Sequence, residues 1–248
     1  MRYKLSAPAT LHTTIQLPAS KSISNRALIL HALAQGHIAP SNLSDCDDTR
    51  VMIKALDGNP GHIDILAAGT AMRFLTAYLS VTPGTRIITG TERMQQRPIR
   101  ILVDALRELG AQIEYAGKEG FPPLRITGTE LTGEEISLAG NVSSQYISAL
   151  LMIGPILKNG LRLNLTGEII SRPYINLTLQ LMKEFGADAA WSSESSITVR
   201  PGKYRDIPFT VESDWSGASY WYQMVALIQD NEKKESTKTE IKLPGLLP

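Results

Sequence analysis

The chain has 248 residues, of which 43% are apolar and 20% charged, so it is long enough to bury a substantial core. Its 25 lysines and arginines against 24 acidic residues leave a net charge of +1, which argues against a polycation that binds nucleic acid through bulk charge. The single cysteine excludes a disulfide framework, and the four histidines show no paired spacing of a zinc site. No apolar run approaches the roughly 18 residues of a membrane span, so a soluble cytoplasmic protein is expected.

The hydrophobic period along the chain alternates between that of a strand and that of a helix, which predicts an α/β fold. Strands are expected at residues 12–17, 85–90, 112–117, 123–128, 134–140, 161–167 and 195–202. Helices are expected at residues 22–35, 47–57, 69–81, 98–109, 143–157 and 173–185. Pro98 and Pro173 stand where the first residue of a helix belongs, and Gly110 and Gly186 stand where those two helices should end.

An internal repeat organises these elements. Residues 85–128 and 161–202 both run strand, Arg-Pro, amphipathic helix, Gly-Ala, strand, turn, strand. A shorter third copy is expected to begin at residues 19–34 and to continue through 44–56 to HIDI at 62–65, with a reduced terminal hairpin. The sequence thus predicts three βαβαββ-like units.

The end of the chain has a different character. Residues 212–228 are rich in aromatic side chains and are predicted to form a capped helix. Residues 229–242 are polar and charged, which is typical of a solvated connector. The last residues, LPGLLP, offer no closing strand, so the sequence is expected to stop inside a domain.

Five predicted helix starts combine small polar residues with cations. They lie at 17–33, 67–75, 91–99, 141–149 and 170–175. Each start alone is explained by helix capping, which favours serine and threonine. If the units pack around a pseudo-threefold axis, however, the starts converge on one face and bring together the cations Lys21, Arg26, Arg73 and Arg97. Local positive charge in a chain of net charge +1 indicates small phosphorylated ligands rather than nucleic acid.

The segments LPASKSISNRAL, AAGTAMRFL, RMQQRPI, VSSQYISALLM and ISRPYI, in this order, resemble the EPSP synthases. The resemblance runs from about Leu17 to Tyr222. It implies a fold of two domains, each made of three βαβαββ units, with the active site between them. In this chain it implies a three-repeat domain that binds shikimate-3-phosphate at residues 17–211, and incomplete portions of a second domain at 1–16 and 212–248.

The resemblance also implies a reaction, in which the enolpyruvyl group of phosphoenolpyruvate is transferred to the 5-hydroxyl of shikimate-3-phosphate. It implies no metal or organic cofactor, no partner besides these two substrates, no nucleic acid or membrane, and a monomer. Lys21 would be catalytic and touch both substrates. The remaining expected contacts are Ser22, Arg26, Ser143, Ser144, Ser171 and Tyr174 to shikimate-3-phosphate, Gly69 and Arg97 to phosphoenolpyruvate, and Gln145 to both.

Several departures from the family pattern accompany these matches. Ala67 replaces an asparagine, Ala19 replaces a glycine, and Phe74 follows the motif arginine where proline is common, which is expected to tilt the helix that carries Gly69. The carboxylates that the family uses for proton transfer cannot be located in this chain. Two alternatives therefore stay open: a non-catalytic anion-binding domain, and UDP-N-acetylglucosamine enolpyruvyl transferase, whose reactive cysteine does not match the position of Cys46.

Overall fold

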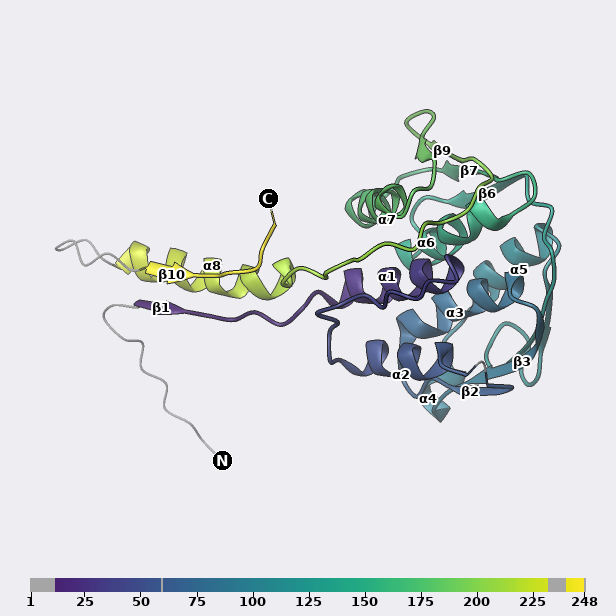
Figure 1. The fold of residues 1–248 in the computed structure, drawn as a ribbon, viewed down its shortest axis with the longest axis horizontal. Coiled ribbons are helices and arrows are strands. Elements are labelled where there is room, and N and C mark those ends of the chain that lie inside the picture. The colour runs from purple at the N-terminus through teal and green to yellow at the C-terminus, as the bar shows by residue number, and fades with distance from the viewer. Residues whose placement is uncertain (1–11, 59, 232–239, 248) are drawn as a thin grey trace.

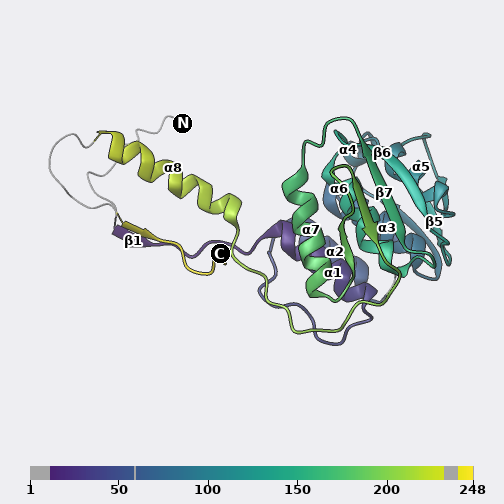
Figure 2. The same ribbon diagram turned by 90° about the horizontal axis from the view of Figure 1, so that it is seen from above.

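The computed structural model describes residues 12–58, 60–231 and 240–247. Figure 1 shows a body that holds most of the helices and both larger sheets, with a small unit of β1, α8 and β10 standing beside it. The view from above shows the same separation, with the chain running between the two parts (Figure 2).

Two sheets in the body have the same topology. The first contains β2 (His62–Asp64), β3 (Gly84–Thr89), β4 (Gln112–Tyr115) and β5 (Leu124–Gly128), in the order β2-β3-β5-β4. The second contains β6 (Glu135–Ala139), β7 (Leu161–Thr166), β8 (Ala189–Trp191) and β9 (Ser196–Val199), in the order β6-β7-β9-β8. In each sheet the first pair is parallel and the other pairs are antiparallel, which confirms the predicted repeat of βαβαββ units.

Helices connect the strands in the same order in both units. The first unit with a sheet contains α3 (Gly69–Val81), the short α4 (Glu92–Gln95) and α5 (Arg100–Glu108). The next contains α6 (Ser144–Ile153), the 3-10 turn η1 (Gly154–Ile156) and α7 (Arg172–Glu184). Gly110 and Gly186 have φ angles of +101° and +90°, so they end α5 and α7 as expected. Pro98 does not start a helix, because α5 begins at Arg100.

The N-terminal unit departs from the prediction. It consists of α1 (Lys21–Leu33) and α2 (Asp47–Leu56). Residues 62–65 do not end this unit, since β2 pairs in parallel with β3, and α3 is the crossover that such a pair requires. Residues 207–213, called the returning segment below, pair with this unit in place of residues 62–65. Ala19 pairs with Ser213, and Ser41 pairs with Thr210.

Three helices lie in the interior of the body, as Figure 1 shows for α1, α3 and α6. Every residue of α1 from Ile23 to Leu30 and every residue of α6 from Tyr146 to Ile153 is buried, and so is nearly all of α3. Helices that are buried on all sides show little amphipathic pattern, whereas α5 and α7 keep a polar outer face. The first helix of each unit therefore belongs to the common core.

The unit beside the body is built from both ends of the described chain. Strand β1 (His12–Thr14) pairs in parallel with β10 (Glu240–Lys242), next to α8 (Trp215–Asn231). The predicted helix at 212–228 is confirmed. The prediction of a polar connector at 229–242 is wrong at both ends, because α8 continues to Asn231 and β10 begins at Glu240. Residues 232–239 lie outside the described residues. No helix within the described ranges is both long and apolar enough to span a bilayer.

Candidate functional site

Four helices begin at one place, and side-chain contacts join them. Lys21 is the first residue of α1, and its Nζ lies 3.0 Å from Oδ2 of Asp48 on α2. The other carboxylate oxygen of Asp48 accepts a hydrogen bond from the backbone N–H of Thr70 on α3 at 3.0 Å. Gln145 on α6 donates from Nε2 to Oγ1 of Thr70 at 3.3 Å. Because helix N-termini carry partial positive charge, this junction favours anions.

Two guanidinium groups lie against the start of α3. A Cβ atom on Gly69 would be 2.5 and 2.9 Å from the terminal nitrogens of Arg97 and 3.0 Å from Nη1 of Arg73. Arg73 also donates to the Gly69 carbonyl oxygen at 2.9 Å. Among the residues that the structure describes, neither arginine forms an ion pair with a carboxylate. Both charges are therefore available to an anion.

Arg73 is the buried member of this pair, and Arg97 is exposed. Arg73 is only 5% exposed, and its guanidinium lies 5.8 Å from the ring centroid of Tyr146. Burial lowers the pKa of Arg73, and the nearby charge of Arg97 lowers it further. Since a buried cation beside a second cation is unfavourable, an anion bound between them would relieve both costs.

Arg26 lies deeper, among the core helices. It is 3% exposed, and its guanidinium donates to Oγ1 of Thr178 at 2.7 Å, to Oγ of Ser148 at 2.9 Å and to the Ser22 carbonyl oxygen at 2.9 Å. Its charge is 5.3 Å above the ring of Phe74. Burial lowers the pKa of Arg26 to about 10, so the side chain stays charged near neutral pH. In this structure its donors join α1, α6 and α7 and face two hydroxyls and one carbonyl oxygen.

The remaining predicted residues sit at the starts of α6 and α7. Ser143 caps α6, where its hydroxyl accepts from the Gln145 N–H at 3.3 Å, and Ser144 follows it, half-buried. Ser171 precedes α7 without capping it through its side chain. Tyr174 is 46% exposed and acts electrostatically on Arg26. Direct contacts thus join Lys21, Gly69, Arg97 and Gln145 through Asp48, Thr70 and Arg73, whereas Ser143, Ser144 and Ser171 share only the helix starts.

The sequence interpretation missed Asp48, Ser148 and Thr178. Two of these leave a signal in the sequence, because Ser148 and Thr178 are polar residues at buried, otherwise apolar positions of α6 and α7. Asp48 leaves a weaker one, since an acidic residue in the first turn of a helix is common. Within the described ranges no three histidine, cysteine or acidic residues gather as metal ligands would.

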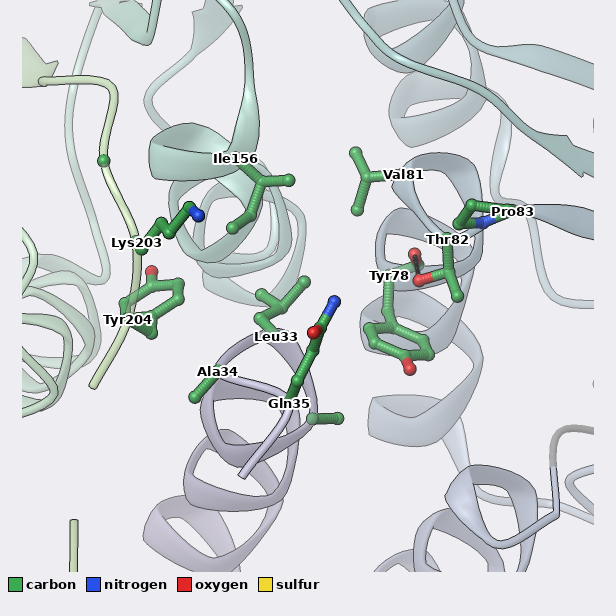
Figure 3. Close-up of a pocket in the computed structure, with 12 residues that line it drawn as sticks. Leu33, Ala34, Gln35, Tyr78, Val81, Thr82, Pro83, Ile156, Lys203 and Tyr204 are labelled. Carbon is green, nitrogen blue, oxygen red and sulfur yellow. Dashed lines mark hydrogen bonds between the residues drawn. The ribbon is translucent and has the colours of Figure 1, made fainter. Parts of the chain in front are cut away.

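A cavity of about 490 Å³ lies at the C-terminal ends of α1 and α3, at the opposite ends of these helices from the candidate site. Figure 3 shows it between the C-terminal ends of α1 and α3, the 3-10 turn η1 and the segment with Lys203 and Tyr204. Helix C-termini carry partial negative charge, which disfavours anions there. This cavity is therefore separate from the junction of helix starts.

The sequence of the whole body and of α8 matches a known family. The family model of EPSP synthase (3-phosphoshikimate 1-carboxyvinyltransferase) matches residues 5–58 and 59–238. The chain belongs to the EPSP synthase family. This result confirms the resemblance found in the sequence motifs and the mixed α/β fold of repeated units.

Curated members of the EPSP synthase family align along nearly the whole chain. A 3-phosphoshikimate 1-carboxyvinyltransferase of Bacteroides fragilis is 72% identical over 246 residues, which are 99% of this chain and 58% of the relative. A protein of the same name from Shewanella halifaxensis is 40% identical over 260 residues, 94% of this chain and 61% of the relative. The chain thus spans about three fifths of the length of the curated relatives it matches.

Solved structures show the same fold at low identity. EPSP synthase from Acinetobacter baumannii aligns with a TM-score of 0.80 and 22% identity, covering 96% of this chain and 57% of that chain. The enolpyruvyl transferase NikO from Streptomyces tendae aligns with a TM-score of 0.62 and 14% identity, covering 86% of this chain and 54% of that chain. These neighbours establish an EPSP-synthase-like fold.

Arg26 provides a prediction on stability. Replacing Arg26 by leucine is expected to lower the free energy of unfolding by about 1–3 kcal/mol, because Ser148 and Thr178 lose a charged partner inside the core. Urea unfolding followed by circular dichroism measures the change. In the matched control Arg100→Leu, the solvent-exposed pair with Glu119 is lost, which should change the stability far less. Equal stabilities of the two variants would show that the Arg26 contacts are not structural.

Proposed function

We propose that this chain carries the shikimate-3-phosphate site and part of the phosphoenolpyruvate site of an EPSP synthase. The longer protein would transfer the enolpyruvyl group of phosphoenolpyruvate to the 5-hydroxyl of shikimate-3-phosphate, a step of aromatic amino-acid biosynthesis. The observation that carries this proposal is the junction of four helix starts with Lys21 and with the guanidinium groups of Arg73 and Arg97, which form no ion pair among the described residues. Both substrates are phosphorylated anions, which such a junction attracts.

The proposed roles follow from the positions of the residues. Arg97 binds phosphoenolpyruvate over Gly69, where the absence of a Cβ leaves room beside the guanidinium. Lys21, 46% exposed, touches both substrates. Gln145 bridges the substrates from the start of α6. The shikimate-3-phosphate pocket is formed by Ser22, Arg26, Ser143, Ser144, Ser171 and Tyr174.

The proposed chemistry is an addition followed by an elimination. The 5-hydroxyl of shikimate-3-phosphate attacks C2 of phosphoenolpyruvate while C3 takes up a proton, and the hydroxyl proton is lost to a base. The resulting tetrahedral intermediate then loses phosphate from C2 and a proton from C3, which restores the double bond. Lys21 stabilises the charge that develops in these steps. The reaction needs no metal or organic cofactor.

The proposed organisation has two parts. Residues 17–211 form the three-repeat domain that binds shikimate-3-phosphate, and 1–16 with 212–248 are portions of a second domain. The separation of β1, α8 and β10 from the body supports this division (Figure 1). The groups that move protons would come from the part of the longer relatives that this chain does not match. We further propose a cytoplasmic monomer with no nucleic-acid or membrane partner.

A turnover assay tests the proposed function. The 248-residue chain is expected to bind shikimate-3-phosphate weakly and to release no phosphate from a mixture of both substrates. A chimera that adds the remaining part of the Bacteroides fragilis relative, 72% identical over its matched residues, is expected to release phosphate. A malachite-green assay measures release, and calorimetry measures binding.

Each result has a clear reading. A folded chimera that binds both substrates without turnover would favour the alternative, a non-catalytic anion-binding domain. Turnover by the 248-residue chain alone would contradict the proposed division of the site. Turnover with UDP-N-acetylglucosamine in place of shikimate-3-phosphate would contradict the proposed substrate.

A further inference from the structure

One carboxylate lies among the cations of the candidate site. Asp48 is 16% exposed in its side chain, and its two oxygens have different partners. Oδ2 is 3.0 Å from Nζ of Lys21, and Oδ1 accepts from the N–H of Thr70 at 3.0 Å. Its charge also acts on Arg73. A group that repels anionic ligands thus stands where anions are expected to bind.

We propose that Asp48 is a positioning residue, which holds the ammonium group of Lys21 and the start of α3 in fixed relation to one another. The inference rests on the proposed function, because the Lys21 ammonium group is held in place for enolpyruvyl transfer. Lysine is a flexible point charge with many rotamers, so it contributes to a transition state only if another group orients it. Asp48 is the group that contacts Lys21 in this structure.

The contact to α3 gives the same carboxylate a second task. Gly69 and Thr70 form the first turn of α3, where Arg73 and Arg97 converge. The N-cap residue Ala68 has no side-chain oxygen to accept from this turn. Asp48 supplies the missing acceptor from a different helix, and it thereby links the position of Lys21 to the position of the two arginines.

A purely structural role makes a different prediction from a positioning role. As a cap, Asp48 needs only an oxygen that accepts from Thr70, which asparagine retains. As an orienting charge for Lys21, it needs the negative charge, which asparagine lacks. Asp48→Asn therefore separates the two roles. Asp47 offers a matched control, because it is the preceding acidic residue of α2 and is exposed.

The two roles also differ in the direction of their effects. In Asp48→Asn a repulsive charge disappears from the anion site, so inorganic phosphate should bind the 248-residue chain about three- to tenfold more tightly. In the chimera, kcat should fall about fivefold, because Lys21 is no longer oriented, while neither KM rises. Asp47→Asn should leave both quantities within about twofold, since an exposed charge is screened by salt.

Calorimetry with inorganic phosphate and steady-state kinetics of the chimera are the two measurements. Weaker phosphate binding in Asp48→Asn, or a kcat within twofold of the parent, would overturn the proposal. If Asp48→Asn fails to fold, Asp48→Glu replaces it: the charge is kept and displaced, so kcat should fall while phosphate affinity stays within twofold.

The phosphate measurement also separates this proposal from the proposed function. If the parent chimera shows no turnover, the proposed function fails. Two measurements then test the inference: phosphate binding by the chain, and covalent labelling of Lys21 with an amine-reactive probe. Labelling should be faster in Asp48→Asn than in Asp47→Asn. Equal reaction rates would overturn the inference.

Discussion

Replacing Lys21 by alanine in the chimera is expected to lower kcat at least about a hundredfold, a loss of roughly 2.7 kcal/mol of transition-state stabilisation. The ammonium group is an exposed cation at the junction of four helix starts, and it is the one proposed to touch both substrates. Its removal also leaves Asp48 without its cation, so a negative charge faces the anions. Turnover should therefore be lost and substrate binding weakened together.

Two further variants make this result specific. Lys54→Ala removes an exposed lysine from the last turn of α2 and should leave kcat within about twofold. Lys21→Arg keeps the charge and should recover part of the activity, although its planar group does not reproduce the geometry of an ammonium. Retention of more than about a tenth of kcat in Lys21→Ala would contradict a transition-state role for this residue.

In the chimera, replacing Gly69 by alanine is expected to raise the KM for phosphoenolpyruvate about tenfold or more and to leave the KM for shikimate-3-phosphate nearly unchanged. The added methyl group would meet the terminal nitrogens of Arg97 and Arg73 at 2.5–3.0 Å, so both guanidinium groups must move away from the start of α3. These atoms end flexible side chains, so the fold should tolerate the change.

The backbone conformation of Gly69 supports this steric explanation of the expected KM change. The structure gives Gly69 no positive φ angle, in contrast to Gly84 or Gly110. Alanine is therefore compatible with the backbone and favours the helix by roughly 0.5–1 kcal/mol. Gly61→Ala is a suitable control, since a Cβ there meets nothing within 4 Å. A lower melting temperature with an unchanged phosphoenolpyruvate KM would reject this explanation.

Much of the fold could be predicted from the sequence because local signals agree with each other. The strands and helices of the two complete units follow from hydrophobic period, from Pro173 and from the glycines that end α5 and α7. Strand β8 was expected only from the repeat and without bounds, because Ala189 and Ala190 carry little strand propensity of their own.

The N-terminal unit could not be predicted because its pairing is not local. HIDI at 62–65 has the pattern of a strand, and the pattern does not reveal whether its partner precedes or follows it. The partners of residues 19 and 41 lie at 213 and 210, and no periodicity connects segments so far apart.

The candidate site, like the fold, could be predicted from the sequence only in part. The helix starts and their cations could be identified from sequence, because charge and capping residues are visible there. The contacts of Arg26 could not, since Ser148 and Thr178 come from two other helices. Asp48 could not be identified, because a phosphate site predicts cations and not a carboxylate, whereas the structure places Asp48 beside Lys21.

The returning segment at 207–213 has a consequence for the order in which the chain can fold. Ser41 and Thr210, whose hydroxyls are 2.8 Å apart, are separated by 169 residues. During synthesis, the contacts of the N-terminal unit with residues 210–213 can form only after both complete units have emerged. Contacts of such high sequence separation slow folding. Fragments that end near residue 201 should therefore leave the polar groups of residues 37–42 without the partners that residues 206–211 supply, and should aggregate, whereas fragments that extend past residue 213 should remain in solution.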